Sequence, residues 1–219
     1  GTIFHRHGVW TILHINNNDH TGSDDEWTPL PSELTDVSAS LDRPYEGSVV
    51  WTVIEKNARV EMRGAVGSGA VYHSFYLTLS SSSTIKGNQI NLYSHDMNIA
   101  GDITGTSKIV LNSAVVAWPQ DNKDASDQST LLINDASSLS CSRCEVAIAY
   151  NGTATIKGDI SCGVIQMDIG DTTHMTSTSS ILASGDSVGI NVLRASLIMD
   201  EGSYPVSYTH LTLPTTDRV

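Results

Sequence analysis

A six-residue motif recurs along most of this chain and constrains its fold more than any other feature of the sequence. In its clearest copies a small residue lies two positions before an apolar anchor, and an Asn or Asp lies three positions after it. The anchors recur at steps of about 22 to 25 residues, a period that is typical of repeat architectures. These core anchors are Val60, Ile85, Ile109, Leu131, Ile156 and Ile181.

Each copy of the motif predicts the start of one coil in a stacked, all-β structure. An anchor strand comes first, and the chain turns at the following Asn or Asp, because these residues tolerate left-handed backbone angles. A second strand follows, and no helical pattern separates the strands, which argues against βαβ units. Stacking the coils at β spacing predicts one inward column of anchors and one column of turn residues that bond one another. The predicted turn residues are Asn88, Asn112, Asn134 and Asp159.

The repeated motif resembles that of the parallel β-helix proteins, which include pectin-lyase-like enzymes and filamentous adhesin passenger domains. The resemblance covers about residues 49–203 and rests on the period and the residue classes. It implies a parallel β-helix, or solenoid, with coils of about 22–25 residues. A β-sandwich is the competing fold, but a sandwich has no reason to repeat one turn residue in every coil. The resemblance indicates architecture and leaves function open.

The sequence divides into three predicted parts. Residues 1–48 form an irregular N-terminal segment of β-strands and loops, and residues 49–205 form the β-helix. Residues 206–219 are predicted to be a non-native tail, because the ten residues that begin at Val206 resemble the translated read-through of a sequencing adaptor. The chain also starts at Gly1 without a Met, so we expect an internal fragment of a longer reading frame.

Charge and composition limit the classes of partner. The net charge is −12, and the few Lys and Arg residues are spread thinly, whereas nucleic-acid binding needs concentrated positive charge. No stretch approaches the roughly 20 apolar residues of a membrane-spanning helix. The acidic, Asn- and Asp-rich surface could attract Ca²⁺, and we expect no other cofactor. Glycans and surface or matrix proteins are the expected partners.

The resemblance to β-helix proteins, many of which cleave polysaccharides, raises the hypothesis of catalytic carboxylates. A glycoside hydrolase needs two carboxylates on one face, and Asp159, Asp168 and Asp171 are the candidates. However, Asp159 belongs to the predicted turn column, and the other two flank a glycine turn. A lyase needs a basic residue beside Ca²⁺ ligands, but neither Arg143 nor Arg194 has acidic residues clustered near it in sequence. The sequence therefore assigns no catalytic residue.

Metal ligands are equally sparse in the sequence pattern. His5 and His7 share one face of a predicted strand, but surface histidines in a polar segment are the favoured interpretation. The oxygen-rich residues 16–26 lack the ligand spacing of a Ca²⁺ loop. The pair Cys141 and Cys144 lacks a second Cys-x-x-Cys, so it and Cys162 are interpreted as packing residues or a disulfide. The sequence assigns no metal-binding or cofactor-binding residue.

These observations predict a structural or adhesive β-helix segment of a larger secreted or cell-surface protein, with glycans among its ligands. Asn151 begins an Asn-Gly-Thr acceptor for N-glycosylation, which agrees with an extracellular location. The alternative is a carbohydrate-active enzyme, a polysaccharide lyase or hydrolase whose site lies partly outside this fragment. A protein-binding module within a giant receptor is a third hypothesis. An adhesin should bind a glycan without changing it, whereas a lyase should create a new double bond and need Ca²⁺.

Overall fold

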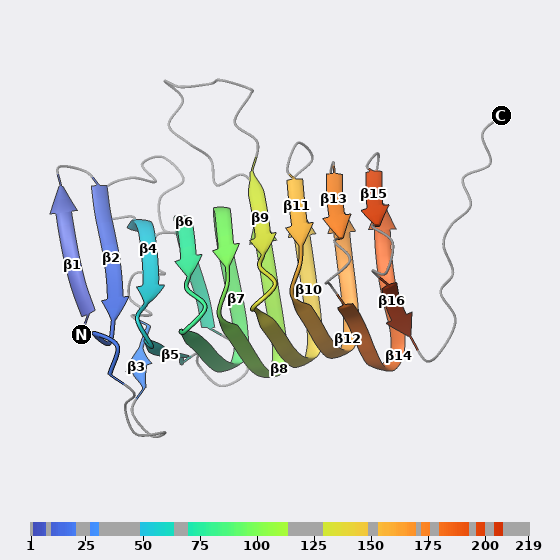
Figure 1. The fold of residues 1–219 in the computed structure, drawn as a ribbon, viewed down its shortest axis with the longest axis horizontal. Helices are drawn as coiled ribbons and strands as arrows, with labels where there is room; N and C mark the ends of the chain where they lie inside the picture. Colours follow the sequence, from blue (N-terminus) through green and yellow to red (C-terminus); the bar gives the residue numbers. More distant parts are fainter. Residues whose placement is uncertain are drawn as a thin grey trace.

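The structure is a computed structural model of the chain, and the part that it describes is built from β-strands and turns. It describes residues 2–7, 10–20, 27–30, 49–63, 70–113, 129–148, 153–169, 172–175, 180–192, 196–199 and 204–207. No helix occurs within these ranges, which confirms the all-β prediction for them (Figure 1). The strands are β1 (Thr2–His7), β2 (Trp10–Asn16), β3 (Thr28–Pro29), β4 (Val49–Glu55), β5 (Arg59–Met62), β6 (Ala70–Leu79), β7 (Thr84–Ile99), β8 (Asp102–Ser113), β9 (Thr130–Ile133), β10 (Ser138–Ile148), β11 (Thr153–Ile156), β12 (Asp159–Ile169), β13 (Thr172–Met175), β14 (Ser180–Val192), β15 (Ser196–Met199) and β16 (Tyr204–Ser207).

Hydrogen bonds link these strands into one largely parallel sheet. β1 and β2 pair antiparallel, and the other strand pairs within the described ranges are parallel. Figure 1 shows the strands side by side along the long axis, with the chain advancing from β1 at one end to β16 near the other. Parallel pairing over this length, with no helix among the residues that the structure describes, is compatible with the predicted β-helix.

The strand pairs form three parallel ladders. Ladder A contains β3, β5, the first parts of β7, β8, β10, β12 and β14, and β16. Ladder B contains the first part of β6, the middle of β7, and the last parts of β8, β10, β12 and β14. Ladder C contains β2, β4, the last parts of β6 and β7, and then β9, β11, β13 and β15. The sequence predicted two strands in each coil, but the register shows three.

The core is made of apolar rows that cross the ladders from strand to strand. Because side chains alternate between the two faces of a strand, one inward residue in every two is enough to build such a row. The rows are fully or almost fully buried, and burial of each Ile or Leu side chain contributes about 1.5–3 kcal/mol. On ladder C one row consists of Ile15, Ile54, Leu79, Ile99, Ile133 and Ile156. On ladder A the corresponding row consists of Val60, Ile85, Ile103, Leu139 and Ile160.

The six sequence-derived anchors do not form the single column that their spacing predicted. Val60, Ile85, Ile109, Leu131 and Ile156 are buried at 1% exposure or less, and the Ile181 side chain lies outside the described residues. Val60 and Ile85 are neighbours on ladder A, but Ile109 lies on ladder B beside Ile90. Leu131 and Ile156 lie on ladder C in different rows. All three ladders alternate inward and outward residues in the same way, so the motif does not encode which ladder it occupies.

The four predicted turn residues likewise do not form one column. Asn88 lies at a register shift in β7, and Asn112 lies on ladder B opposite Tyr93. Asp159 is the first residue of β12 and pairs with Ser138. Asn134 does lie in a turn, and its Nδ2 donates a 2.6 Å hydrogen bond to Oδ1 of Asn98 in the preceding coil. Among the described residues, Asn134 therefore makes a contact of the predicted kind, but with Asn98, which the motif did not indicate.

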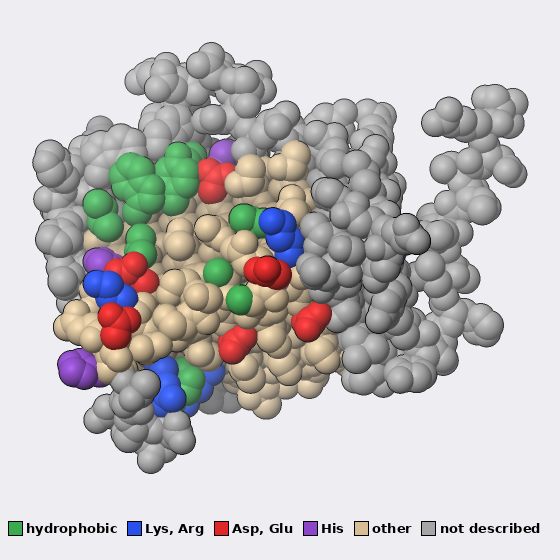
Figure 2. Space-filling model, viewed as in Figure 1, with side chains coloured by type: hydrophobic (Ala, Val, Ile, Leu, Met, Phe, Trp, Pro, Cys, Tyr) green, Lys and Arg blue, Asp and Glu red, His purple; other side chains and the backbone are tan. Residues whose placement is uncertain are grey.

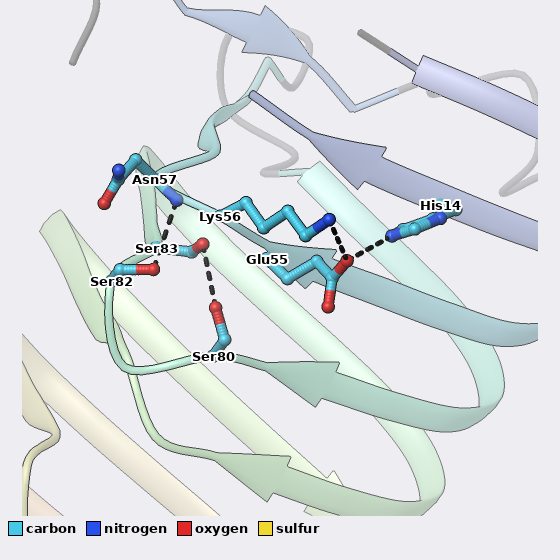
Figure 3. A network of polar contacts seen from close by, with 7 residues as sticks. All are labelled: His14, Glu55, Lys56, Asn57, Ser80, Ser82 and Ser83. Atoms are coloured by element: carbon cyan, nitrogen blue, oxygen red, sulfur yellow. Dashed lines mark hydrogen bonds and ion pairs between the residues drawn. The ribbon is translucent and has the colours of Figure 1, made fainter. Parts of the chain in front are cut away.

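Two kinds of corner connect ladder C to ladder A. Long corners are four-residue turns at 17–20, 55–58, 80–83 and 134–137, each closed by a backbone hydrogen bond from its fourth residue to its first. The pair Lys56 and Asn57 has φ of 54° and 61°, left-handed values that Asn accepts readily. Figure 3 shows how two long corners join: the Asn57 amide donates to Ser82 Oγ at 3.1 Å, and Ser80 Oγ lies 3.1 Å from Ser83 Oγ.

Glu55 extends this polar network to the neighbouring strand. Its Oε1 lies 2.8 Å from His14 Nε2 on β2 and 4.0 Å from Lys56 Nζ (Figure 3). These side chains are partly exposed, and such surface pairs contribute about 0–1 kcal/mol each. The network therefore orders the corner, whereas the buried rows supply most of the stability.

Short corners have two residues and lie on the long corners of the preceding coil. In the described part of the chain they are residues 100–101 and 157–158, and each ends in glycine. A Cβ at Gly101 would lie 2.1 Å from the carbonyl oxygen of Ser83 and 2.4 Å from that of Ser80. At Gly158 it would lie 2.3 Å from the carbonyl oxygen of Asn134. Glycine is thus required at these corners by the closeness of the neighbouring backbone.

One polar pair interrupts the apolar core, and it supports a stability prediction. Thr52 Oγ1 and the Tyr72 hydroxyl lie 2.7 Å apart, and both residues are 1% exposed. Burial raises the pKa of Tyr72, so the phenol is neutral and can donate or accept. We expect Tyr72→Phe and Thr52→Val each to cost about 1–3 kcal/mol, because each leaves a buried hydroxyl without its partner. The double variant should cost less than the sum, measured by urea denaturation; strictly additive losses would contradict this pairing.

The structure also reaches the start of the predicted tail. Val206 and Ser207 belong to β16, where they pair with Leu182 and Ala183 of β14. Residues 208–219 lie outside the described residues.

Candidate functional site

The outward face of ladder C carries an aromatic pair that is open to solvent. Trp51 and Tyr76 are register neighbours on β4 and β6, and their rings stack with centroids 5.2 Å apart and planes 10° apart. Trp51 is 38% exposed and is the one large hydrophobic side chain among the described residues that is exposed. Figure 2 shows apolar side chains gathered on the surface over β4 and β6. A Trp–Tyr pair offers a large apolar area together with polar ring edges.

A carboxylate follows the aromatic pair in the same outward row. Asp96 on β7 is in register with Tyr76, and Thr130 on β9 is in register with Asp96. The backbone amide of Thr130 donates to Asp96 Oδ1 at 3.1 Å, and His95 Nδ1 lies 3.2 Å from Asp96 Oδ2. Burial alone would raise the pKa of Asp96, but the close approach of His95 and the hydrogen bonds from Thr130 lower it below its usual value. Asp96 is therefore a fixed anionic acceptor beside the aromatic pair.

His95 is itself held by an aromatic neighbour. Its ring stacks on Phe75 with centroids 4.6 Å apart and planes 7° apart, and both side chains are buried. The outward row then continues in register from Thr130 to Thr153 on β11. We call the row Trp51, Tyr76, Asp96 and Thr130 the aromatic–acid row. It combines an exposed apolar surface with a positioned carboxylate and a threonine on one rigid sheet.

A second tryptophan is covered by cationic side chains. Lys86 Nζ lies 3.8 Å from the centroid of the Trp27 ring, and the Arg59 guanidinium carbon lies 5.9 Å from it. Trp27 borders a cavity of about 360 Å³ near the N-terminal end of the described coils. The lining residues are Ile15, Asn16, Asn17, Trp27, Thr28, Ala58 and Arg59. Because Lys86 already contacts the Trp27 ring, Trp51 is the better candidate for contact with a ligand.

The candidate catalytic residues are placed only in part. Asp159 is exposed at the start of β12, whereas the Asp168 side chain and the whole of Asp171 lie outside the described residues. Arg143 donates through Nε to Glu145 Oε1 at 2.7 Å and through Nη2 to Gln166 Oε1 at 3.2 Å. Arg194 also lies outside the described residues. The predicted grouping of these three carboxylates therefore falls outside the described residues, except for Asp159 itself.

The histidine and glycosylation candidates are also placed only in part. His5 and His7 belong to β1, where their backbones alone are described, and His14 contacts Glu55. Of the oxygen-rich residues 16–26, residues 16–20 form the end of β2 and a long corner, and residues 21–26 lie outside the described part. Asn151 lies outside it too.

The three cysteines come together, which the sequence interpretation missed. Their Sγ atoms all lie within 4.8 Å of one another, and Cys141 is in register with Cys162. Cys144 and Cys162 are buried, and Cys141 is partly buried. Hydrogen bonds from the thiols of Cys144 and Cys162 lower the pKa of Cys141, and the same interactions with Cys141 raise the pKa of its two partners. The coil period could have indicated this cluster, since Cys162 follows Cys141 by about one coil.

Comparison with known proteins adds no family. No protein-family model matches the chain, no curated protein matches its sequence, and no solved structure matches its fold. In the described part of the chain, no helix has the length and apolarity that crossing a membrane requires. The arrangement of the chain's own residues is therefore the basis for a proposed function.

Proposed function

We propose that this chain is a segment of a parallel β-helix that serves a structural or adhesive role in a larger secreted or cell-surface protein. The support for the β-helix is the set of three parallel ladders, each of which advances by one strand per coil. Apolar rows inside such coils stabilise a stiff rod, and the outward residues of each strand are left to make contacts. The likeness in repeat pattern to pectin-lyase-like and filamentous adhesin proteins points in the same direction.

Glycans are the ligand class that we propose for this rod. The observation that carries the proposal is the aromatic–acid row, in which the exposed Trp51 and its partner Tyr76 lie beside Asp96. A sugar ring has apolar C–H groups on its faces and hydroxyl groups around its rim. Aromatic side chains can contact the C–H groups, while a carboxylate and a threonine hydroxyl can bond to the sugar hydroxyls. A ligand that lies across the strands would meet these residues one after another at the spacing of the strands.

The test is glycan binding by matched variants. We expect the chain to bind members of a glycan array, and we expect Trp51→Ala to weaken that binding about tenfold or more, as truncation of a central aromatic contact does. Thr155→Ala is the control, because Thr155 is half-buried on β11 of the same ladder, away from the aromatic pair. The measurement is calorimetric titration with the best glycan of the array. Equal affinity for Trp51→Ala and the wild-type chain would refute this site.

The enzymatic alternative predicts a different result in the same experiment. A hydrolase would release reducing ends from the polysaccharide, and a lyase would produce an unsaturated uronate in a Ca²⁺-dependent manner. Under the adhesive proposal the glycan is recovered unchanged after prolonged incubation. Release of either product by the purified chain would favour the carbohydrate-active enzyme, with the β-helix retained as its scaffold.

A further inference from the structure

Three sulfur atoms converge at the bend between ladder A and ladder B. β10 makes this bend where its register against β8 shifts, between Ser140 and Arg143. Cys141 ends the ladder A part of β10, and Cys144 lies just beyond the bend on ladder B. Cys162 stands in register with Cys141 on β12, one coil further along. All three residues therefore lie on paired strands, which hold a site more accurately than loops do.

The distances between the sulfur atoms suit a shared metal ion. All three Sγ atoms lie within 4.8 Å of one another. Sulfur atoms that bind one Zn²⁺ at about 2.3 Å are separated by about 4 Å, so only small side-chain adjustments are required. Cys144 is 0% exposed and Cys162 is 2% exposed, whereas Cys141 is partly open. An ion would therefore enter from the side of Cys141.

The surroundings of the thiols also fit a thiolate site. The backbone amides of Ile109 and Arg143 favour the thiolate of Cys141 and help to lower its pKa. Backbone donors of this kind stabilise ligand sulfur and fix its orientation. On ladder B, Cys144 lies in register between Ile109 and Ile165, both fully buried. These isoleucines form an apolar wall that keeps water from the buried side of the cluster.

We propose that Cys141, Cys144 and Cys162 bind one thiophilic metal ion of the Zn²⁺ type through three thiolates. Among the described residues the cluster contains these three cysteines and no His, Asp or Glu, so the fourth position would face the open side. Thiolate ligands favour Zn²⁺ and Cu⁺ over Mg²⁺ and Ca²⁺. Each thiol that binds as a thiolate loses its proton to solvent, and the ion gains three sulfur ligands. This inference does not depend on the proposed glycan binding.

Two simpler explanations make different predictions. Cysteine is a small apolar residue, and packing alone could explain its presence in a core. Under that explanation the cluster would have no affinity for a metal. A disulfide could also join two of the three sulfurs, which would lower the mass of the chain by two hydrogens and leave one thiol. Both explanations are separable from metal binding by experiment.

The test uses Cd²⁺, a heavier ion of the same electronic type whose bonds to thiolates absorb in the ultraviolet. The full chain is reduced, freed of metal and titrated with Cd²⁺ without oxygen. We expect the charge-transfer absorption to saturate at one ion per chain and the melting temperature to rise by about 5–10 °C at a hundredfold excess over Kd. Cys141→Ser should abolish the saturable one-ion absorption and the rise. Ser142→Ala is the matched control, because Ser142 is exposed and lies between the ligands.

The metal-free melting temperature of Cys141→Ser shows whether that variant is folded, and Cys141 is the most exposed of the three. If Cys141→Ser does not fold, the stoichiometry and absorption of the wild-type chain still decide the question. Absence of a saturable absorption in the reduced wild-type chain would overturn the proposal. So would a folded Cys141→Ser variant that binds Cd²⁺ as the wild type does. A disulfide in the chain as isolated, together with no binding of Cd²⁺ after that disulfide is reduced, would replace the metal site with the redox explanation.

Discussion

Replacement of Ile109 by Asp is expected to lower the melting temperature of the chain by about 10–20 °C, the largest effect that we predict. Ile109 is 0% exposed and lies on ladder B between Ile90 and Cys144. An aspartate there would be ionised without a partner, or neutral with an unsatisfied carboxyl group, and either state costs several kcal/mol. Losses above about 4 kcal/mol are exceptional for single substitutions and indicate a buried polar group of this kind.

The measurement is thermal unfolding followed by circular dichroism in metal-free buffer, because Ile109 adjoins the thiol cluster. Thr106→Asp is the matched control, since it introduces the same charge at an exposed position of the same strand. Ile109→Val should cost only about 0.5–1.5 kcal/mol, because it removes one buried methyl group and adds no charge. If Ile109→Asp had the same melting temperature as Thr106→Asp, Ile109 would not lie in the core and the register of ladder B would be refuted.

Gly158→Ala is expected to cost about 3 kcal/mol, which is unusually large for the addition of one methyl group. The new Cβ would lie 2.3 Å from the carbonyl oxygen of Asn134 and 2.6 Å from that of Ser137. Neither oxygen can rotate away as the end of a side chain could, so the two corners must separate. In most settings Gly→Ala is neutral or stabilising because it restricts the unfolded chain, and here the sign should be reversed.

The fall in melting temperature should be about 6–12 °C, measured by the same thermal unfolding. Ala136→Gly is the control, because Ala136 is exposed in the adjoining long corner. Gly101→Ala should show the same behaviour as Gly158→Ala, since it has the same relation to residues 80–83. Unchanged stability in both glycine variants would mean that the coils are spaced more widely than the structure has them.

The repeat of apolar anchors was enough to predict an all-β chain with largely parallel pairing, because period and strand alternation are local properties of the sequence. Which anchors touch was not predictable in the same way. Ile109 and Leu131 are separated by an ordinary motif step, yet they lie on ladders B and C. Equal spacing along the chain therefore conceals a change of ladder.

The candidate sites were less predictable still. Trp51 and Tyr76 are ordinary aromatic residues of two separate strands until the register brings their rings together. Cys141 and Cys144 were visible as a pair, but Cys162 becomes their neighbour only through the stacking of one coil on the next. Contacts across ladders depend on the number of residues in each corner, and the motif carries no record of that number.

The two kinds of corner limit how such a rod can grow. Each short corner lies on a long one, since the glycines of residues 100–101 and 157–158 approach the carbonyl groups of residues 80–83 and 134–137. Long corners, in contrast, stack on each other, as residues 55–58 and 80–83 do. A short corner placed on another short corner would lack the recess that accepts its glycine. A coil with a long corner could therefore be duplicated or transplanted alone along this part of the chain, whereas a coil with a short corner could be duplicated only together with the long-corner coil that precedes it.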